Sequence, residues 1–129
     1  MVRRLYTPEL ANRSLALVRR IATDVQAVAR RIQAHAGKLR AARAGAGDST
    51  DTDDLDDLHD RFTALVGELE ALGVELKDPL TGLLDFRARR QGQEVYLCWR
   101  LGEDAVGHWH TLDGGFATRQ PLDKSPLED

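Results

Sequence analysis

Two stretches of the sequence decide the fold: residues 18–39, VRRIATDVQAVARRIQAHAGKL, and residues 55–72, LDDLHDRFTALVGELEAL. In both stretches apolar residues recur every three or four positions, which aligns them along one side of an α-helix. The first stripe consists of Val18, Ile21, Val25, Val28, Ile32, His35 and Leu39, and the second of Leu55, Leu58, Phe62, Leu65, Leu69 and Leu72. The pattern predicts two helices that pack along these stripes as a long antiparallel, coiled-coil-like hairpin.

The residues that flank each stripe predict where the helices begin and end. Thr7-Pro8-Glu9 offers a hydroxyl cap, a first-turn proline and an acid, so the first helix is expected over residues 7–44. A loop rich in glycine and aspartate follows, and the second helix is expected from Thr52–Asp54 to Gly73. The predicted pairs across the hairpin are Leu39 with Leu58, His35 with Phe62, Ile32 with Leu65, Lys38 with Asp60, and Arg43 with Asp54.

The two predicted helices differ in length. Residues 7–24 of the first helix find no partner on the second helix, yet they carry apolar side chains that need cover. Either the carboxyl-terminal region or a second copy of the chain packs on them. A regular seam with apolar surface left over favours a homodimer.

After Gly73 the apolar pattern changes from helical to alternating, which is typical of strands. The expected strands span residues 74–77, 83–89, 94–101 and 106–110, with a last short strand at residues 116–119. The tail, residues 121–129, contains two prolines and is expected to fray. The sequence therefore predicts one α+β domain, residues 1–129, with a helical hairpin (7–73) followed by a small antiparallel β-meander (74–120).

Composition limits the class of protein. Hydrophobic residues make up 42% of the 129 residues and charged residues 30%, which fits a globular protein. No apolar run approaches the roughly 18 residues that a membrane span needs. The single cysteine, Cys98, rules out an internal disulfide, and a cytoplasmic location without membrane contact is expected.

The net charge of -3 conceals a basic first helix and an acidic second helix. A basic helix alone would suggest nucleic acid. Because the acidic helix folds against the basic one, their charges are expected to neutralise each other in large part. Nucleic-acid binding is therefore disfavoured.

Scarce residue types gather within residues 95–119, which contain both tryptophans, the only cysteine and two of the four histidines. Cys98, His108 and His110 are candidate ligands for zinc or another transition metal, with Glu103 as a further ligand or general base. A two-residue turn before the strand expected at residues 106–110 would put the histidines on the face opposite Cys98. Only a longer loop or a bulge would bring the sulfur and the imidazoles together.

The same segment also permits interpretations without a metal. Cys98 can be a small, buried apolar residue beside tryptophans of the core, with the histidines on a face that is partly exposed to solvent. A nucleophilic cysteine is a further alternative, although no third member of a Cys-His arrangement is fixed by spacing. Glu103 and Arg119 are candidates for a buried ion pair that braces the meander. Asp78 and Asp85 are a candidate carboxylate pair, although Asp78 precedes a proline and is foremost part of a turn.

Six segments carry a resemblance to a known family: Tyr6–Asn12, Leu72–Pro79, Gly82–Phe86, Val95–Glu103, Trp109-His110 and Gly115–Ala117. The chain resembles a bacterial family catalogued as domain of unknown function 2203. The segments span nearly the whole chain in family order, and the combination of Cys-Trp-x-x-Gly-Glu with Trp-His is fairly specific. Leu10 stands where the family would have a second acid. The resemblance implies a helical hairpin joined to a compact carboxyl-terminal part, and it implies no activity.

Two functions are expected from these observations. The favoured one is a non-enzymatic, dimeric interaction module, without catalytic residues or cofactor, that offers a protein partner a surface formed by Glu103, Trp109, His110 and Arg119. The alternative is a small metal-binding protein or metal-dependent enzyme that uses Cys98, His108, His110 and Glu103.

Overall fold

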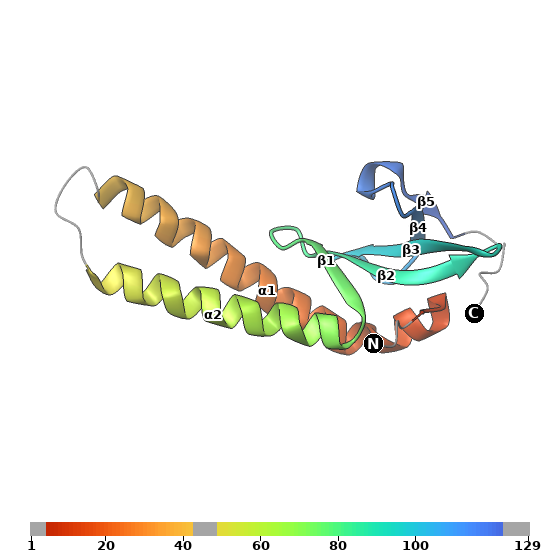
Figure 1. Cartoon of the computed structure of the whole chain (residues 1–129), viewed down its shortest axis with the longest axis horizontal. Coiled ribbons are helices and arrows are strands. Elements are labelled where there is room, and N and C mark those ends of the chain that lie inside the picture. The colour runs from red at the N-terminus through yellow and green to blue at the C-terminus, as the bar shows by residue number, and fades with distance from the viewer. Residues whose placement is uncertain (1–4, 43–48, 123–129) are drawn as a thin grey trace.

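The computed structural model describes residues 5–42 and 49–122, and for residues 39–42 and 49–53 it describes the backbone alone. Helices α1 (Pro8–Ala42) and α2 (Ser49–Ala71) form an antiparallel hairpin that projects from a five-stranded sheet (Figure 1). The strands pair antiparallel in chain order. They are β1 (Val74–Asp78), β2 (Leu83–Arg90), β3 (Gln93–Arg100), β4 (His108–Thr111) and β5 (Gln120–Pro121), with the short 3-10 helix η1 (Phe116–Thr118) before β5. The predicted α+β fold, a helical hairpin followed by a β-meander, is confirmed.

Both ends of the hairpin nearest the sheet are capped as the sequence predicts. The Leu10 amide donates to Thr7 Oγ1 at 3.2 Å, which satisfies one of the free amides of the first turn of α1. Gly73 adopts φ 78°, a left-handed conformation that favours glycine, and its amide donates to the Glu70 carbonyl at 2.9 Å. The chain therefore leaves α2 in a tight turn and enters β1 at once.

The helices pair in a register that differs from the predicted one. Ile32 lines a shared hollow with His59 and Phe62 rather than facing Leu65. The reason is that α2 begins at Ser49, earlier than the expected Thr52–Asp54, which shifts the pairing toward the amino end of α2. The predicted ion pair between Lys38 and Asp60 does not form among the described residues. The side chain of Leu39 and the predicted pair of Arg43 with Asp54 lie outside the described part.

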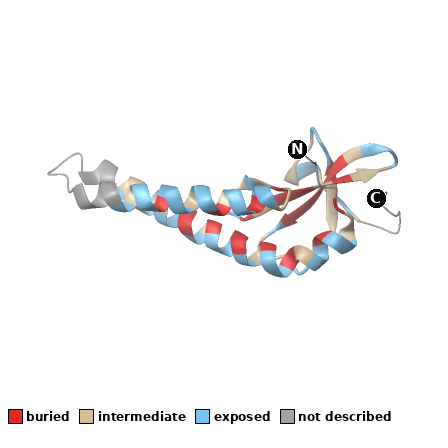
Figure 2. Cartoon of the chain, turned by 60° about the horizontal axis from the view of Figure 1, so that its bottom comes forward, coloured by how far each residue is buried: buried red, intermediate tan, exposed pale blue. Residues whose placement is uncertain are grey.

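The sheet covers the part of α1 that has no partner on α2. Figure 2 shows the buried residues of the helices and of the sheet facing one another. They form one apolar cluster that includes Ala11, Leu15, Val18 and Ile21 from α1, Leu65 and Leu69 from α2, and Leu84, Phe86, Leu97 and Trp99 from the sheet. The carboxyl-terminal region therefore packs on residues 7–24 of α1, which is one of the two arrangements expected from the sequence.

The loop between β3 and β4 is longer than the predicted turn. The strand β4 begins at His108 rather than at Val106, so seven residues connect it to β3. Val106 is pulled out of the strand because its side chain is buried in the core and its amide donates to Asn12 Oδ1 of α1 at 2.8 Å. This length decides which face of the sheet the histidines occupy.

The segment after β4 also departs from the prediction. Residues 116–118 form the 3-10 helix η1 instead of a strand. The short strand β5 follows, with Pro121 opposite His108, and the Leu122 amide donates to the Gly107 carbonyl at 2.8 Å. The predicted tail thus begins with two residues that pair with the sheet, and its remainder, residues 123–129, lies outside the described residues.

The amino-terminal segment ties the hairpin to the sheet. The Tyr6 amide donates to the Arg87 carbonyl of β2 at 2.7 Å, and its hydroxyl donates to the Leu72 carbonyl at the end of α2. The Tyr6 ring meets Phe86 edge to face, with centroids 5.1 Å apart. Over the described residues, neither helix carries the long apolar segment that would let it cross a membrane.

Candidate functional site

The sheet has two chemically different faces because alternate residues of a strand point to opposite sides. The face toward the helices carries the apolar residues of β2 and β3, such as Phe86 and Leu97. The outer face carries Asp85 on β2, Cys98 on β3 and His110 on β4. These three polar residues are nevertheless buried, with exposed fractions of 2%, 0% and 3%. A fully buried polar group on an outer face marks a candidate site.

The long loop before β4 puts both histidines on the same face as the cysteine. Cys98 pairs with His108, and Tyr96 pairs with His110, in the β3–β4 register. Residues that pair across strands share a face, so both histidines lie on the same face as Cys98. The structure does not have the two-residue turn that would have put them on the opposite face. The longer connection that the metal hypothesis required is present.

One donor atom from each of Asp85, Cys98 and His110 lies within 4.8 Å of the other two. Among the described residues, no other group of three or more His, Cys, Asp or Glu side chains meets this condition. Asp85 comes from β2 and His110 from β4, and Cys98 sits on the strand between them. Adjacent strands therefore build the group, and the sheet holds it rigidly.

The hydrogen bonds of His110 fix where its protons lie. His110 Nδ1 is 2.7 Å from the Thr111 carbonyl oxygen, which can only accept, so Nδ1 carries a proton and donates it. His110 Nε2 lies 3.0 Å from Asp85 Oδ2. A hydrogen bond here needs one proton, held either by the imidazole or by the carboxyl group. The pair of side chains therefore shares a single proton between these two atoms.

The carboxyl group of Asp85 is incompletely satisfied. Its Oδ1 atom is buried and finds no hydrogen-bond partner in the described part of the chain. Burial raises the pKa of Asp85, and the nearby His110 and Lys77 offset this only in part. A buried acceptor without a partner costs about 1–3 kcal/mol. The Cys98 thiol also lies close enough to this carboxyl group to lower its pKa, so Oδ1 and the thiol are together the groups available to a bound ion.

Cys98 is not placed to act as a nucleophile. Burial, and then the adjacent Asp85 carboxylate, raise the pKa of the thiol to about 11, so the reactive thiolate is scarce at neutral pH. Both ring nitrogens of His110 are engaged, one by Asp85 and the other by the main chain. No nitrogen of His110 therefore remains to take the thiol proton, as a Cys-His pair requires.

The state of Cys98 leads to a simple prediction. In metal-free native protein at pH 8, we expect a thiol reagent to label Cys98 at least about a hundred times more slowly than a free cysteine of pKa near 8.5. Unfolding in denaturant should restore the ordinary rate, which serves as the internal control. Native labelling at the rate of an exposed cysteine would contradict the buried, protonated thiol.

A salt bridge covers the cysteine from the outside. Arg119 donates from Nη1 to Glu103 Oε1 at 3.0 Å and from Nη2 to Oε2 at 2.6 Å, and its Nη1 lies 3.9 Å from Cys98 Sγ. Burial acts to raise the pKa of Glu103, but Arg119 and the Arg100 amide outweigh it and lower the pKa. The guanidinium groups of Arg100 and Arg119 lie over the Phe116 ring, 4.6 Å and 4.1 Å from its centre. The predicted ion pair of Glu103 with Arg119 is confirmed.

The two glycines before η1 shape this cover. A Cβ atom at Gly114 would meet Thr118 Oγ1 at 2.6 Å, so a larger residue there would displace the Thr118 side chain. The Gly115 amide donates to Thr118 Oγ1 at 3.0 Å, which holds η1 in place above the sheet. The glycine pair therefore positions Phe116 and Arg119.

Comparison with known proteins adds a family to this geometry. The model of an uncharacterised conserved protein family, DUF2203, matches residues 4–122 of the chain. The chain belongs to the DUF2203 family. No curated protein and no solved structure matches it.

In this DUF2203 protein the residues predicted to form a site do not all meet. Cys98 and His110 belong to the buried group, whereas Glu103 is paired with Arg119 and His108 lies on the same face, opposite Cys98 in the β3–β4 register and outside the group. Trp109 lies on the helix-facing side, opposite Leu97, with the Arg90 guanidinium 4.4 Å from its ring centre. The expected recognition surface is therefore not one patch, because His110 is buried and Trp109 faces the other way.

Asp85 is the site residue that the sequence did not assign to the metal. The sequence offered it only as a partner of Asp78, whose carboxylate instead accepts from the Leu80 amide and the Thr81 hydroxyl in the turn after β1. The available signal was the position of Asp85 between Leu84 and Phe86 in an otherwise apolar strand. An acid in such a strand must be buried or must face a polar layer.

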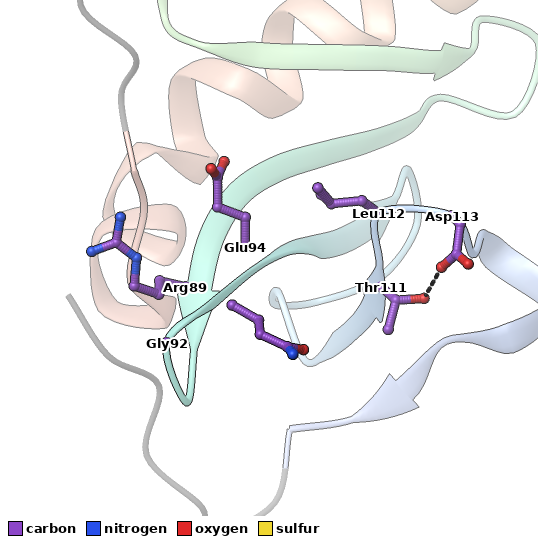
Figure 3. Close-up of a pocket in the computed structure, with 7 residues that line it drawn as sticks. Arg89, Gly92, Glu94, Thr111, Leu112 and Asp113 are labelled. Atoms are coloured by element: carbon purple, nitrogen blue, oxygen red, sulfur yellow. Dashed lines mark hydrogen bonds between the residues drawn. The ribbon is translucent and has the colours of Figure 1, made fainter.

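A second hollow of the DUF2203 protein lies at the turn between β2 and β3 (Figure 3). It has a volume of about 710 Å³, and Arg89 and Glu94 on the two strands face it together with Leu112 beyond β4. On its wall the Thr111 hydroxyl donates to Asp113 Oδ1 at 2.7 Å. The buried group of Asp85, Cys98 and His110 does not line this hollow, so the hollow and the buried group are separate features.

Proposed function

We propose that this protein is a small metal-binding domain in which Asp85, Cys98 and His110 hold one divalent transition-metal ion. The observation that carries the proposal is the meeting of a carboxylate, a thiol and an imidazole within 4.8 Å in a buried position. These are the three ligand types that zinc prefers. Two of the three candidate ligands, Cys98 and His110, also belonged to the set expected from sequence, and Asp85 takes the place of His108 and Glu103.

The distances between the donor atoms support this assignment. Bonds of about 2.0–2.3 Å to a tetrahedral zinc ion separate its ligand atoms by about 3.3–3.8 Å. The 3.0 Å between His110 Nε2 and Asp85 Oδ2 would have to widen by a few tenths of an ångström to admit the ion.

The hydrogen bond from His110 Nδ1 to the Thr111 carbonyl is a second support. A histidine that binds a metal through one nitrogen nearly always donates the other N–H to a carbonyl or carboxylate, which orients the ring. Here the free nitrogen, Nε2, points at Asp85 and toward the proposed ion position. The unpartnered Oδ1 of Asp85 offers one more acceptor to the ion.

Charge balance favours a divalent ion. The thiolate of Cys98 and the carboxylate of Asp85 contribute two negative charges, and neutral His110 contributes none, so a divalent ion makes the buried group neutral. Formation of the complex releases the thiol proton and the proton shared by Asp85 and His110. Zinc affinity should therefore fall as the pH is lowered.

Burial argues for a binding role rather than catalysis. The three ligands expose at most 3% of their surface, and the salt bridge of Glu103 with Arg119 closes the space above Cys98. A catalytic zinc has three protein ligands and an open fourth position, whereas protein atoms fill all four positions of a structural zinc. Here Asp85 Oδ1 would supply the fourth donor when the carboxylate binds through both oxygens. The proposed function is accordingly non-enzymatic.

The test compares two histidines of β4 that lie on the same face of the sheet, of which only His110 belongs to the buried group. The wild-type protein should bind one equivalent of Zn²⁺ in equilibrium dialysis with elemental analysis, and Co²⁺ should give a near-ultraviolet sulfur-to-metal charge-transfer band. His110→Ala should lose both signals, whereas His108→Ala should retain them. Absence of binding by the wild type, or full binding by His110→Ala, would overturn the proposal.

Assembly is the second candidate function, and it rests on the hairpin rather than on the meander. The hairpin projects from the sheet as a stalk, and its outer surfaces face away from the rest of the chain (Figures 1 and 2). With the amino half of α1 covered by the sheet, the leftover apolar surface no longer argues strongly for a homodimer. The argument for a homodimer comes instead from the charges on the stalk.

A further inference from the structure

One face of the hairpin is identified by a contact between its helices. Arg61 Nη2 of α2 lies 3.9 Å from Asp24 Oδ2 of α1. Helix residues spaced by four, seven or eleven positions lie on the same side, so the neighbours of this contact follow from the sequence. The charged residues at these spacings are Arg13, Arg20 and Arg31 on α1 and Asp54, Asp57 and Glu68 on α2. We call Arg20, Arg31, Asp57 and Glu68, the four nearest the middle of the hairpin, the charged face.

The charged face is exposed, and no ion pair with a described residue neutralises its charges. All four side chains are exposed, and none makes an ion pair with another residue in the part of the chain that the structure describes. The contact of Asp24 with Arg61 runs opposite to the general charge of the two helices. Over the helix residues whose side chains the structure describes, the expected mutual neutralisation is therefore not found, and α1 presents positive charge beside the negative charge of α2.

The same face carries exposed apolar side chains. Leu10 and Leu17 precede Asp24 by fourteen and seven positions, which places all three in one row along α1. Leu10 is 46% exposed and Leu17 is 47% exposed. Exposed leucines next to unpaired charges are typical of a surface that a partner covers.

The opposite face of the hairpin is already occupied in part. Gln26 Nε2 donates to the Leu80 carbonyl of the turn after β1 at 2.9 Å, and Pro79 and Leu80 line a hollow together with Phe62. The chain therefore covers one face of the hairpin with its own turn and leaves the charged face open.

We infer that the charged face binds the charged face of a second copy of this chain. With a two-fold axis along the hairpin, α1 of each copy lies antiparallel to α2 of the other. Arg20 and Arg31 are eleven residues apart, as are Asp57 and Glu68. Arg20 therefore meets Glu68 of the second copy in the same register in which Arg31 meets Asp57, and symmetry repeats both pairs. This inference names the partner for the assembly role and is independent of the metal centre.

A charge exchange tests the inference. Wild-type protein should scatter light as a dimer of the 14.3 kDa chain, and its dissociation constant should rise with salt. The double variants Arg20→Glu/Arg31→Glu and Asp57→Lys/Glu68→Lys should each be monomers, with dissociation constants raised at least tenfold. Mixed in equal amounts they should dimerise again, because every contact of the mixed dimer then joins opposite charges.

The controls separate this interface from other causes. Arg30→Glu changes an exposed charge that lies about 100° around the helix from Arg31, and it should leave the dimer intact. A wild-type monomer at all concentrations, dimers of either double variant, or failure of the mixture to dimerise would overturn the inference. Zinc binding by the same samples reports on the metal centre alone, so failure of one proposal is distinguishable from failure of the other.

Discussion

The Leu65→Asp variant is expected to lose its cooperative thermal transition at neutral pH, because Leu65 is 2% exposed in the centre of the apolar cluster. Truncation of a buried leucine costs about 2–5 kcal/mol by itself. The carboxylate adds several kcal/mol, since no cation in the cluster can pair with it. Together these costs approach the whole stability of a small domain, about 5–15 kcal/mol.

Circular dichroism during heating and urea titration would measure this effect. Thr63→Asp is the matched control, because it adds the same charge two residues away on the exposed side of α2 and should change stability by less than about 0.5 kcal/mol. A cooperative melt of Leu65→Asp within a few degrees of the wild type would show that the hairpin is not packed as described.

The second large effect concerns Asp85→Asn, which should stabilise the metal-free protein and abolish its response to zinc. Because burial raises the pKa of Asp85, the folded protein loses stability as the pH rises from the ordinary value of 3.8 through the raised value. Asparagine has the same shape without the charge, and its amide can donate to His110 Nε2. We expect a gain of about 1–3 kcal/mol at pH 7, which vanishes below about pH 4.

Zinc should reverse the order of the two proteins. At a hundredfold excess over the dissociation constant, the ion should stabilise the wild type by about 2.7 kcal/mol. Asp85→Asn lacks an anionic ligand and should melt at the same temperature with and without zinc. Thermal melts at pH 4 and pH 7 measure both effects, with Asp104→Asn, an exposed acid in the loop before β4, as the control. If Asp85→Asn were less stable than the wild type at pH 7 without zinc, the account of Asp85 would be wrong.

Local patterns predicted the elements of the fold, and long-range packing decided what they did not predict. The helix periodicity, the Thr7 cap and Gly73 depend on neighbours in the sequence, so the hairpin and its ends at the sheet could be predicted. The start of β4 depends on Val106, whose amide donates to Asn12 Oδ1 of α1 and whose side chain is part of the core. No property of residues 101–110 alone indicates this contact.

The candidate site was partly predictable for the same reason. Cys98 and His110 belong to scarce residue types and stand out in the sequence, and their common face required only a long enough loop. Asp85 belongs to a common residue type, and its role depends on a pairing between β2 and β3 that brings it beside Cys98. Glu103 and Arg119 could be predicted to pair, but the position of that pair above the thiol follows from the path of η1.

Tyr6 has a consequence for how the protein is made. Its contacts with Arg87 and Leu72 join the first residues of the chain to residues that leave the ribosome much later. While the nascent chain is shorter than about one hundred residues, Val18 and Ile21 lack the strands that cover them in the folded protein. The helices therefore emerge with their apolar sides exposed to solvent. Newly synthesised chains should therefore depend on chaperones until β3 is complete, and truncated translation products should be the most aggregation-prone form of this protein.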